Sequence, residues 1–288
     1  MKNYVICCDS ACDLKTELLS ELGVRFVPLS FRFNGEDKEY SNNDMNIKDF
    51  YDRMRAGDVA KTAAVNVEGF AGMFEDILKE GNDVLYIGFS SGLSTTYNSA
   101  RLAALQLSEK YPENKIIVVD TLCASAGIGI LIDLAVEKKN SGADIEEVAE
   151  YVKSKLMNLC QWFTVDDLVY LKRGGRISST KAFVGNLLGI KPVLHVDNEG
   201  HLVSVDKVRG RRTSVMALAD KYGELALTKE SGLVYISHGD CEDDAKLLAD
   251  TIKSKYGAEV KVITDVGTVI GAHSGPGTLA LFFLGRER

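Results

Sequence analysis

The stretch DVLYIGFSSGLSTTYNSA, residues 83–100, constrains the fold of this chain more than any other. It opens with an apolar run typical of a buried strand, and from Ala100 onward small and apolar residues recur at helical spacing. A strand therefore passes into a helix through a loop rich in hydroxyl groups, namely Ser90, Ser91, Ser94, Thr95 and Thr96. Backbone N–H groups are unpaired where a helix begins, so such a loop can hold an anion without lysine or arginine. Alternatively, Ser94 or Thr95 only caps the helix.

The same alternation of strand and helix runs through the first half of the chain. Apolar strands are predicted at residues 4–8, 83–87 and 115–120, with helical patterns between them. This order favours a mostly parallel sheet with helices on both faces. Such sheets bind ligands at the carboxyl ends of their strands, where this chain has Asp9, Ser90 and Asp120. The acidic and hydroxyl residues after the first strand also suit simple helix capping.

Two amphipathic helices are predicted on either side of residues 61–66. Apolar residues recur at helical spacing over residues 47–54 and again over residues 70–77. Before them, residues 24–33 alternate as a strand, and Asn34-Gly35 is a strong hairpin signal. We therefore expect a small pair of strands in this part of the chain.

The pattern changes near residue 160. A hairpin is predicted across Asn198-Glu199-Gly200, and a helix is predicted over residues 242–256 between two further strands. The sequence therefore predicts two α/β domains, at residues 1–160 and 161–288, the first with a mostly parallel sheet and the second mixed.

Composition and targeting patterns narrow the possible functions. The formal net charge of -7 argues against a general nucleic-acid-binding protein. The six cysteines lack the spacing of a zinc site, so no metal is expected and buried reduced thiols are predicted. No signal-peptide pattern opens the sequence, and its longest apolar stretch, residues 124–136, is too short to span a membrane. These features predict a cytoplasmic protein.

An acyl hydrolase is the main alternative from the residues alone. Residues 88–92, GFSSG, match the G-x-S-x-G nucleophile elbow and follow a strand as that motif requires. Asp120 and then His238 or His273 complete the chain order Ser, Asp, His. However, the helix begins several residues after the serine, whereas an elbow enters its helix directly. Ser90 is the nucleophile in this alternative.

Two glycine motifs suggest nucleotide binding but are incomplete. Residues 172–176, KRGGR, place glycines beside cations that can cradle a phosphate, yet no G-x-x-x-x-G-K-[ST] motif occurs. Gly127 and Gly129 resemble part of a dinucleotide fingerprint, but they lie in an apolar helix, where close packing explains them better. His273, among glycines beside Pro276, is the histidine whose setting suggests a site.

Motifs along nearly the whole chain, in this combination and order, resemble the DegV family of bacterial fatty-acid-binding proteins. They are Asp9-Ser10 with Asp13-Leu14, Ser90 to Ser94 with Thr96-Tyr97, Val119-Asp120 with Ser125 and Gly127, Leu168 to Ser178, Lys191 to Leu194, and Gly271 with His273 to Thr278.

The resemblance implies two α/β domains that enclose one long-chain, palmitate-like fatty acid between them, without a cofactor or catalytic activity. It implies that hydroxyls of Thr62 and Ser94 hold the carboxylate, with Ser91 and Thr95 in the same loop and His273 nearby. It also implies that some members present the acyl group to a fatty acid kinase. Physical reasoning is consistent with this, because hydroxyl donors offset the desolvation of a buried carboxylate.

This sequence departs from the family pattern at two places. Ala63-Ala64-Val65 replaces the usual Ser, Gln and Pro, and Thr95 replaces the usual glycine after the loop serine. We expect the first change to affect the shape of the pocket and the second to affect the backbone at the carboxylate. A cationic face for a kinase or for transient membrane contact, or else an ordinary solvated surface, is expected at Arg173, Arg176, Arg209 and Arg211.

Overall fold

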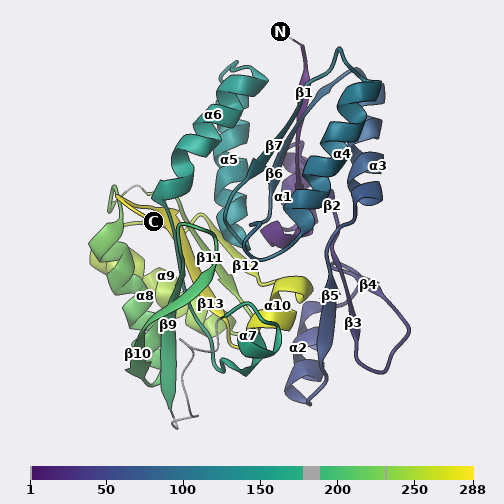
Figure 1. Cartoon of the computed structure of the whole chain (residues 1–288). Coiled ribbons are helices and arrows are strands. Elements are labelled where there is room, and N and C mark those ends of the chain that lie inside the picture. Colours follow the sequence, from purple (N-terminus) through teal and green to yellow (C-terminus); the bar gives the residue numbers. More distant parts are fainter. Residues whose placement is uncertain (1, 178–188, 231) are drawn as a thin grey trace.

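The computed structural model describes residues 2–177, 189–230 and 232–288, and the strands of these residues form three sheets (Figure 1). The first sheet is parallel, in the order β2-β1-β6-β7. Its strands are β1 (Tyr4–Asp9), β2 (Arg25–Val27), β6 (Asp83–Gly88) and β7 (Ile116–Asp120). Helices cover both of its faces, α3 (Val67–Lys79) and α4 (Thr96–Lys110) on one, α5 (Ala126–Asn140) and α6 (Ile145–Lys155) on the other. The parallel α/β prediction is confirmed.

The second sheet is mixed and has the strand order β10-β9-β8-β13-β11-β12. Its strands are β8 (Leu159–Thr164), β9 (Ile190–Val196), β10 (Leu202–Arg209), β11 (Val234–His238), β12 (Val262–Asp265) and β13 (Leu279–Leu284). Helices α8 (Arg211–Leu225) and α9 (Glu242–Tyr256) pack on one face. The predicted hairpin around residues 198–200 and the predicted helix at 242–256 are confirmed. The expected boundary between residues 160 and 161 falls within β8.

The third sheet, of order β4-β3-β5, contains β3 (Ser30–Phe33), β4 (Tyr40–Ser41) and β5 (Ala60–Ala63). One continuous strand over residues 24–33 is wrong, because the run divides into β2 and β3, which lie in different sheets. Pro28 interrupts it, since proline has no N–H for a ladder. The adjacent Leu29 N donates to Ser10 Oγ instead. The expected strand pair exists as β3 and β4, joined by residues 34–39.

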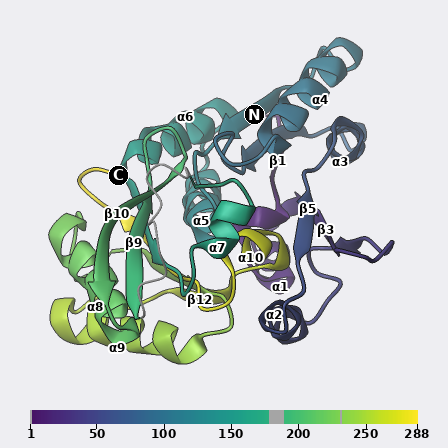
Figure 2. The same ribbon diagram turned by 60° about the horizontal axis from the view of Figure 1, so that its bottom comes forward.

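Two short helices lie between the small sheet and the six-stranded sheet. They are α7 (Val169–Arg173) and α10 (Thr268–Ser274), and they pack against each other. Figures 1 and 2 both show α10 beside β5 and α2 (Ile47–Arg55). Phe50 and Tyr51 of α2 share an apolar cluster with Ala272 of α10. This contact joins residues from opposite ends of the sequence.

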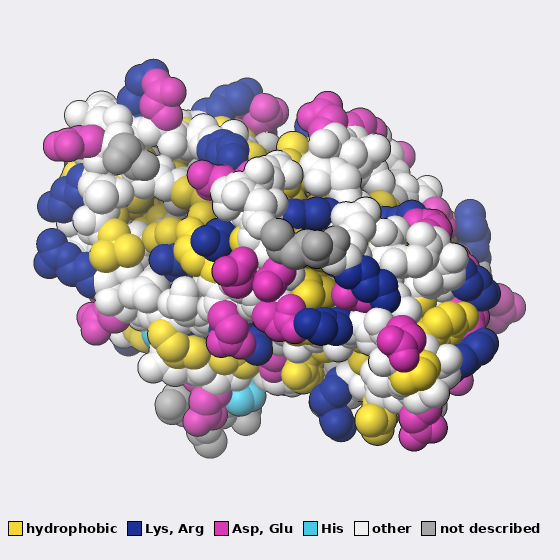
Figure 3. Space-filling view, turned by 90° about the horizontal axis from the view of Figure 1, so that it is seen from above, with side chains coloured by type: hydrophobic (Ala, Val, Ile, Leu, Met, Phe, Trp, Pro, Cys, Tyr) yellow, Lys and Arg dark blue, Asp and Glu magenta, His cyan; other side chains and the backbone are white. Residues whose placement is uncertain are grey.

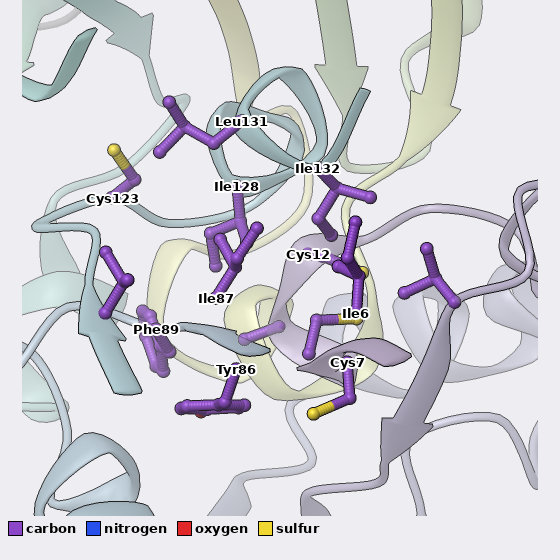
Figure 4. Packing of buried hydrophobic residues seen from close by; sticks show 14 of the residues in the cluster. Ile6, Cys7, Cys12, Tyr86, Ile87, Phe89, Cys123, Ile128, Leu131 and Ile132 are labelled. Carbon is purple, nitrogen blue, oxygen red and sulfur yellow. The ribbon is translucent and has the colours of Figure 1, made fainter. Parts of the chain in front are cut away.

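Helix α5 is the shared layer between the two large sheets. It packs on β1 and β6 on one side and on β11 and β13 on the other. Ten of its residues are buried, as expected for a helix that is apolar on all sides. Figure 4 shows Ile128 beside Ile87 of β6. At Gly129 a Cβ atom would come 2.9 Å from Leu14 Cδ2, so close packing does explain this glycine.

The surface carries charges of both signs. Figure 3 shows Lys, Arg, Asp and Glu side chains interspersed over the face seen from above. Over the described ranges, no helix has the length and apolar character needed to cross a bilayer.

Candidate functional site

A cavity of about 310 Å³ lies between the two halves of the chain. Most of its wall is apolar, and the lining includes Leu29, Phe89, Leu93, Phe163, Val196, Leu202, Val269, Ile270, Ala280 and Phe282. Polar groups also reach it, including Thr62, Ser94, Thr95, Arg176 and His273. A concave, mostly apolar wall with some polar groups is the usual construction of a site for a small amphipathic ligand.

The hydroxyl-rich loop between β6 and α4 forms part of this wall and is fixed by several different elements. Phe89 N donates to Asp9 Oδ2 at 3.0 Å, and Ser90 N donates to Cys123 O at 2.9 Å. Ser91 N donates to Asp120 Oδ1 at 3.2 Å. The ends of β1, β6 and β7 therefore meet at this loop, although Asp9, Ser90 and Asp120 do not themselves line the cavity. These three backbone hydrogen bonds fix the position of the loop.

Thr62 and His273 form a direct contact beside the cavity. Thr62 Oγ1 lies 2.8 Å from His273 Nε2, and the two residues come from β5 and α10. We assign the imidazole proton to Nε2, because the buried Nδ1 has no partner among the described residues and faces Gly174. The imidazole then donates to Thr62, which leaves the Thr62 hydroxyl proton free for an acceptor in the cavity.

His273 is neutral over the physiological pH range. Burial, together with the positive charge of Arg176, lowers the pKa of His273 to about 4. Its close contact with the turn after α7 depends on Gly174, where a Cβ atom would lie 2.2 Å from His273 Nδ1. The histidine is therefore a positioned hydrogen-bonding group and carries no charge at neutral pH.

Arg176 brings a positive charge to the cavity wall. Its Nε donates to Leu93 O at 3.1 Å and its Nη1 to Gly174 O at 2.6 Å. Among the described carboxylates none forms an ion pair with it. Burial lowers the pKa of the guanidinium. The cavity therefore has a partly buried cation for which the described chain provides no counter-charge.

The expected carboxylate residues do not all lie together. Thr62, Ser94, Thr95 and His273 line the cavity, whereas Ser91 is exposed and is not part of the lining. Ser94 Oγ lies 2.9 Å from Thr96 Oγ1 and accepts the N–H of Thr96, the first residue of α4, at 3.2 Å, and Ser94 also lines the cavity.

The four arginines of the expected cationic face have different surroundings. Arg173 and Arg209 are exposed, while Arg176 turns to the cavity. Arg211 is paired with Asp244 at 2.8 Å and with Asp166 at 3.6 Å. Lys207, in the same part of the chain, also has a partner. Ser178, in the LVYLKRGGRIS motif, lies outside the described residues.

Ser90 has the environment of a structural residue. It is completely buried, and its hydroxyl donates to Gly200 O at 3.0 Å and accepts Gly92 N at 3.1 Å. Within the described ranges neither candidate histidine bonds to it, since His273 contacts Thr62 and His238 lies 3.8 Å from Asp265. The geometry gives the hydrolase alternative no support.

Sequence reasoning missed a polar chain behind the cavity. Asp13 Oδ2 accepts Ser125 Oγ at 2.5 Å, and Ser125 Oγ lies 2.9 Å from Ser237 Oγ. Burial raises the pKa of Asp13 to about 8. Gln161 also lines the cavity. The signal for Gln161 is a polar residue between Cys160 and Trp162 in a mostly apolar strand, and Ser237 follows the apolar Ile236 near the end of β11. In the described parts of the chain, no group of three or more metal-ligating side chains comes together.

Comparisons with known proteins find similarity along almost the entire chain. The family model described as "Uncharacterised protein, DegV family" matches residues 3–286. A DegV domain-containing protein of Clostridium perfringens is 41% identical over 288 residues, covering 99% of this chain and 98% of its own. A protein of Thermotoga maritima called "Fatty acid-binding protein" is 34% identical and covers 94% of each chain.

Solved structures show the same fold. A DegV lipid-binding protein from Thermotoga maritima has a TM-score of 0.87 and 32% identity and covers 99% of both chains. A DegV-family protein from Thermus thermophilus, described for its fatty acid binding, has a TM-score of 0.89 and 30% identity and covers 99% of this chain and all of its own.

Proposed function

Because this chain belongs to the DegV family, we propose that it binds one long-chain fatty acid in the cavity between its two halves. The observation that carries the proposal is the Thr62 and His273 pair, with Ser94 and Arg176, at the wall of a mostly apolar cavity. The printed descriptions of the relatives, which name lipid and fatty acid binding, support the ligand class.

The acyl chain supplies the affinity in this proposal. A palmitate-sized tail gains about 0.8 kcal/mol per buried methylene, on the order of 11 kcal/mol before the losses from immobilisation. Apolar side chains from both halves provide the surface for this burial. No reaction is needed for the task, so we propose a binding protein without catalysis or a cofactor.

The polar groups orient the ligand by its carboxylate. The Thr62 and Ser94 hydroxyls donate to the carboxylate, because the neutral His273 leaves the proton of Thr62 free. The guanidinium of Arg176 has no carboxylate partner in the described chain, and in this proposal it pairs with the carboxylate of the fatty acid. Thr95 stands at the exposed side of the same wall.

The test is native mass spectrometry of purified and delipidated protein, with identification of the released ligand and titration with palmitate. We expect one bound fatty acid per chain in the wild type and a large loss of affinity in the variant Thr62→Ala/Ser94→Ala. Ser91→Ala is the matched control, because Ser91 belongs to the same loop but lies outside the cavity. Full affinity in the double variant would refute the residue assignment, and a wild type that binds no fatty acid would refute the function.

We further propose that the protein is a cytoplasmic carrier that presents its ligand to a fatty acid kinase and exchanges it through transient membrane contact. Exposed Arg173 and Arg209 are the candidate contacts for an acidic kinase surface or anionic headgroups. The six free cysteines suit a reducing compartment.

Charge reversal tests the carrier role separately from binding. The variant Arg173→Glu/Arg209→Glu is expected to keep fatty acid affinity but to slow exchange with anionic vesicles and phosphorylation by a fatty acid kinase. Arg101→Glu on α4 is the control, since Arg101 is exposed on a different element. If exchange and phosphorylation both stay at wild-type rates, these two arginines are not the contact.

A further inference from the structure

The lining residues along strand β13 show in which direction the cavity extends. Ala280 and Phe282 of β13, together with Thr278 just before the strand, line the cavity, and among the described lining residues this alternating series stops at Phe282. Thr278 follows α10, the helix that carries His273, after only a short connection. His273 therefore lies toward the Thr278 end, and the cavity extends along about 13 Å of extended chain from Thr278 to Phe282.

Phe282 and Gln161 lie side by side at the end of this series that is away from His273. They are directly paired across β13 and β8, so they occupy one row of the sheet. The Gln161 amide is fixed, because Oε1 accepts Ala124 N at 3.2 Å and Nε2 donates to Leu122 O at 3.4 Å. Gln161 is 2% exposed. Because moving a buried amide would break its hydrogen bonds, the Gln161 side chain forms a rigid part of the cavity wall.

The Phe282 ring is supported from behind by helix α5. A Cβ atom at Gly127 would lie 3.0 Å from Phe282 Cδ1 and 3.0 Å from Gln161 Oε1. The helix therefore packs directly against the ring and the amide, and the side that remains open to the ring is the cavity. Close packing of this kind transmits a change of one methyl group to its neighbour.

We propose that Phe282 and Gln161, supported by Gly127, form the floor of the cavity and set the longest acyl chain that the protein accepts. The inference rests on the proposed fatty acid function and adds the determinant of chain length. A chain that reaches the floor buries all of its methylenes, while a longer chain must bend or leave carbons outside. Each methylene gained or lost in the cavity changes affinity about fourfold.

Two substitutions that act in opposite directions test the floor. Saturated acids from decanoic to eicosanoic acid are titrated into delipidated wild type, Phe282→Ala and Gly127→Ala. Phe282→Ala deepens the cavity, so its affinity maximum is expected to move to longer acids. Gly127→Ala pushes the ring into the cavity, so its maximum is expected to move to shorter acids, with about a fourfold loss for each methylene excluded.

Gly129→Ala is the matched control on the same helix. Its Cβ atom would lie 2.9 Å from Leu14 Cδ2, so it is crowded to a similar degree, but Leu14 does not line the cavity. We expect the wild-type chain-length profile. Phe282→Leu is a milder change, and we expect it to move the affinity maximum to longer acids by less than Phe282→Ala does. It tests the floor assignment if Gly127→Ala fails to fold.

The outcomes separate the two proposals. A wild type with a clear length optimum and unchanged optima in Phe282→Ala and Phe282→Leu would overturn the floor assignment while leaving fatty acid binding intact. A wild type that binds none of the acids would instead overturn the proposed function.

Discussion

At the scale of single residues, burial determines the protonation state of His273. The unfolded chain binds a proton at His273 near pH 6.5, the ordinary imidazole value, whereas the folded protein resists protonation until about pH 4. The unfolded state thus binds more protons in this interval. The contribution of His273 to the free energy of unfolding should therefore fall as the pH is lowered from about 6.5 to about 4, and level off below it.

The measurement compares wild type with His273→Asn by chemical denaturation at several pH values and follows the imidazole by NMR. The variant should lose this part of the acid dependence. The comparison is necessary because Asp13, whose pKa is raised to about 8, contributes with the opposite sign: its stabilising effect is lost as the pH rises toward 8. Equal slopes in both proteins, or an NMR midpoint near 6.5, would contradict the assignment.

Whether the role of a residue could be predicted depends on how far away in the sequence its interaction partners lie. Thr62, Ser94 and His273 were expected through the family resemblance, and all line the cavity. Asp9 was expected to be a cap, and its Oδ1 does accept Ala11 N, but its Oδ2 also accepts Tyr86 Oη and fixes Phe89. Such bonds span about 80 residues of sequence, so no local pattern shows them.

At the scale of elements, the turn after α7 positions His273 through a glycine that has ordinary helical dihedrals. Gly174 has φ -72° and ψ -12°, so alanine is allowed there by its backbone. Its Cβ would nevertheless overlap His273 Nδ1. We expect Gly174→Ala to displace the imidazole, break the contact with Thr62 and lower fatty acid affinity by about tenfold.

Isothermal titration with palmitate measures this effect. Gly72→Ala in α3 is the control, because a Cβ there meets nothing within 4 Å. Palmitate affinity equal to that of wild type in Gly174→Ala would show that the packing of His273 on this turn does not matter for binding.

A helix with a strong hydrophobic period could be predicted from the sequence, but the sheet that each strand joins could not. Residues 242–256 form the predicted helix because a helix needs only local contacts and an apolar stripe. The division of residues 24–33 between two sheets depends on Pro28 and on a hydrogen bond to Ser10. The alternation of side chains is the same whichever sheet a strand joins, so the pattern does not reveal the partner.

At the scale of the whole molecule, the cavity exists because two halves meet along a seam of long-range bonds. Tyr51 Oη donates to Val266 O at 2.7 Å, and Val269 N donates to Asn42 Oδ1 at 2.9 Å. These partners are 215 and 227 residues apart in the sequence. Two α/β halves were predictable, but the docking of the small sheet on α10 was not, since neither surface has a sequence signature of its own.

A ligand between two halves should stabilise both, because it touches the described walls on either side of the seam. Binding to the folded state alone raises the free energy of unfolding by RT ln(1 + [L]/Kd), about 2.7 kcal/mol at a free fatty acid concentration of 100 Kd. Delipidated protein should therefore unfold at a lower denaturant concentration than lipid-bound protein. Added palmitate should return the unfolding midpoint to the value of the lipid-bound protein. At the same palmitate concentration Thr62→Ala/Ser94→Ala should recover much less, because its Kd is higher. Unfolding midpoints that do not respond to palmitate in the delipidated wild type would mean that the acid does not bind the folded state, and the cavity would then need another ligand.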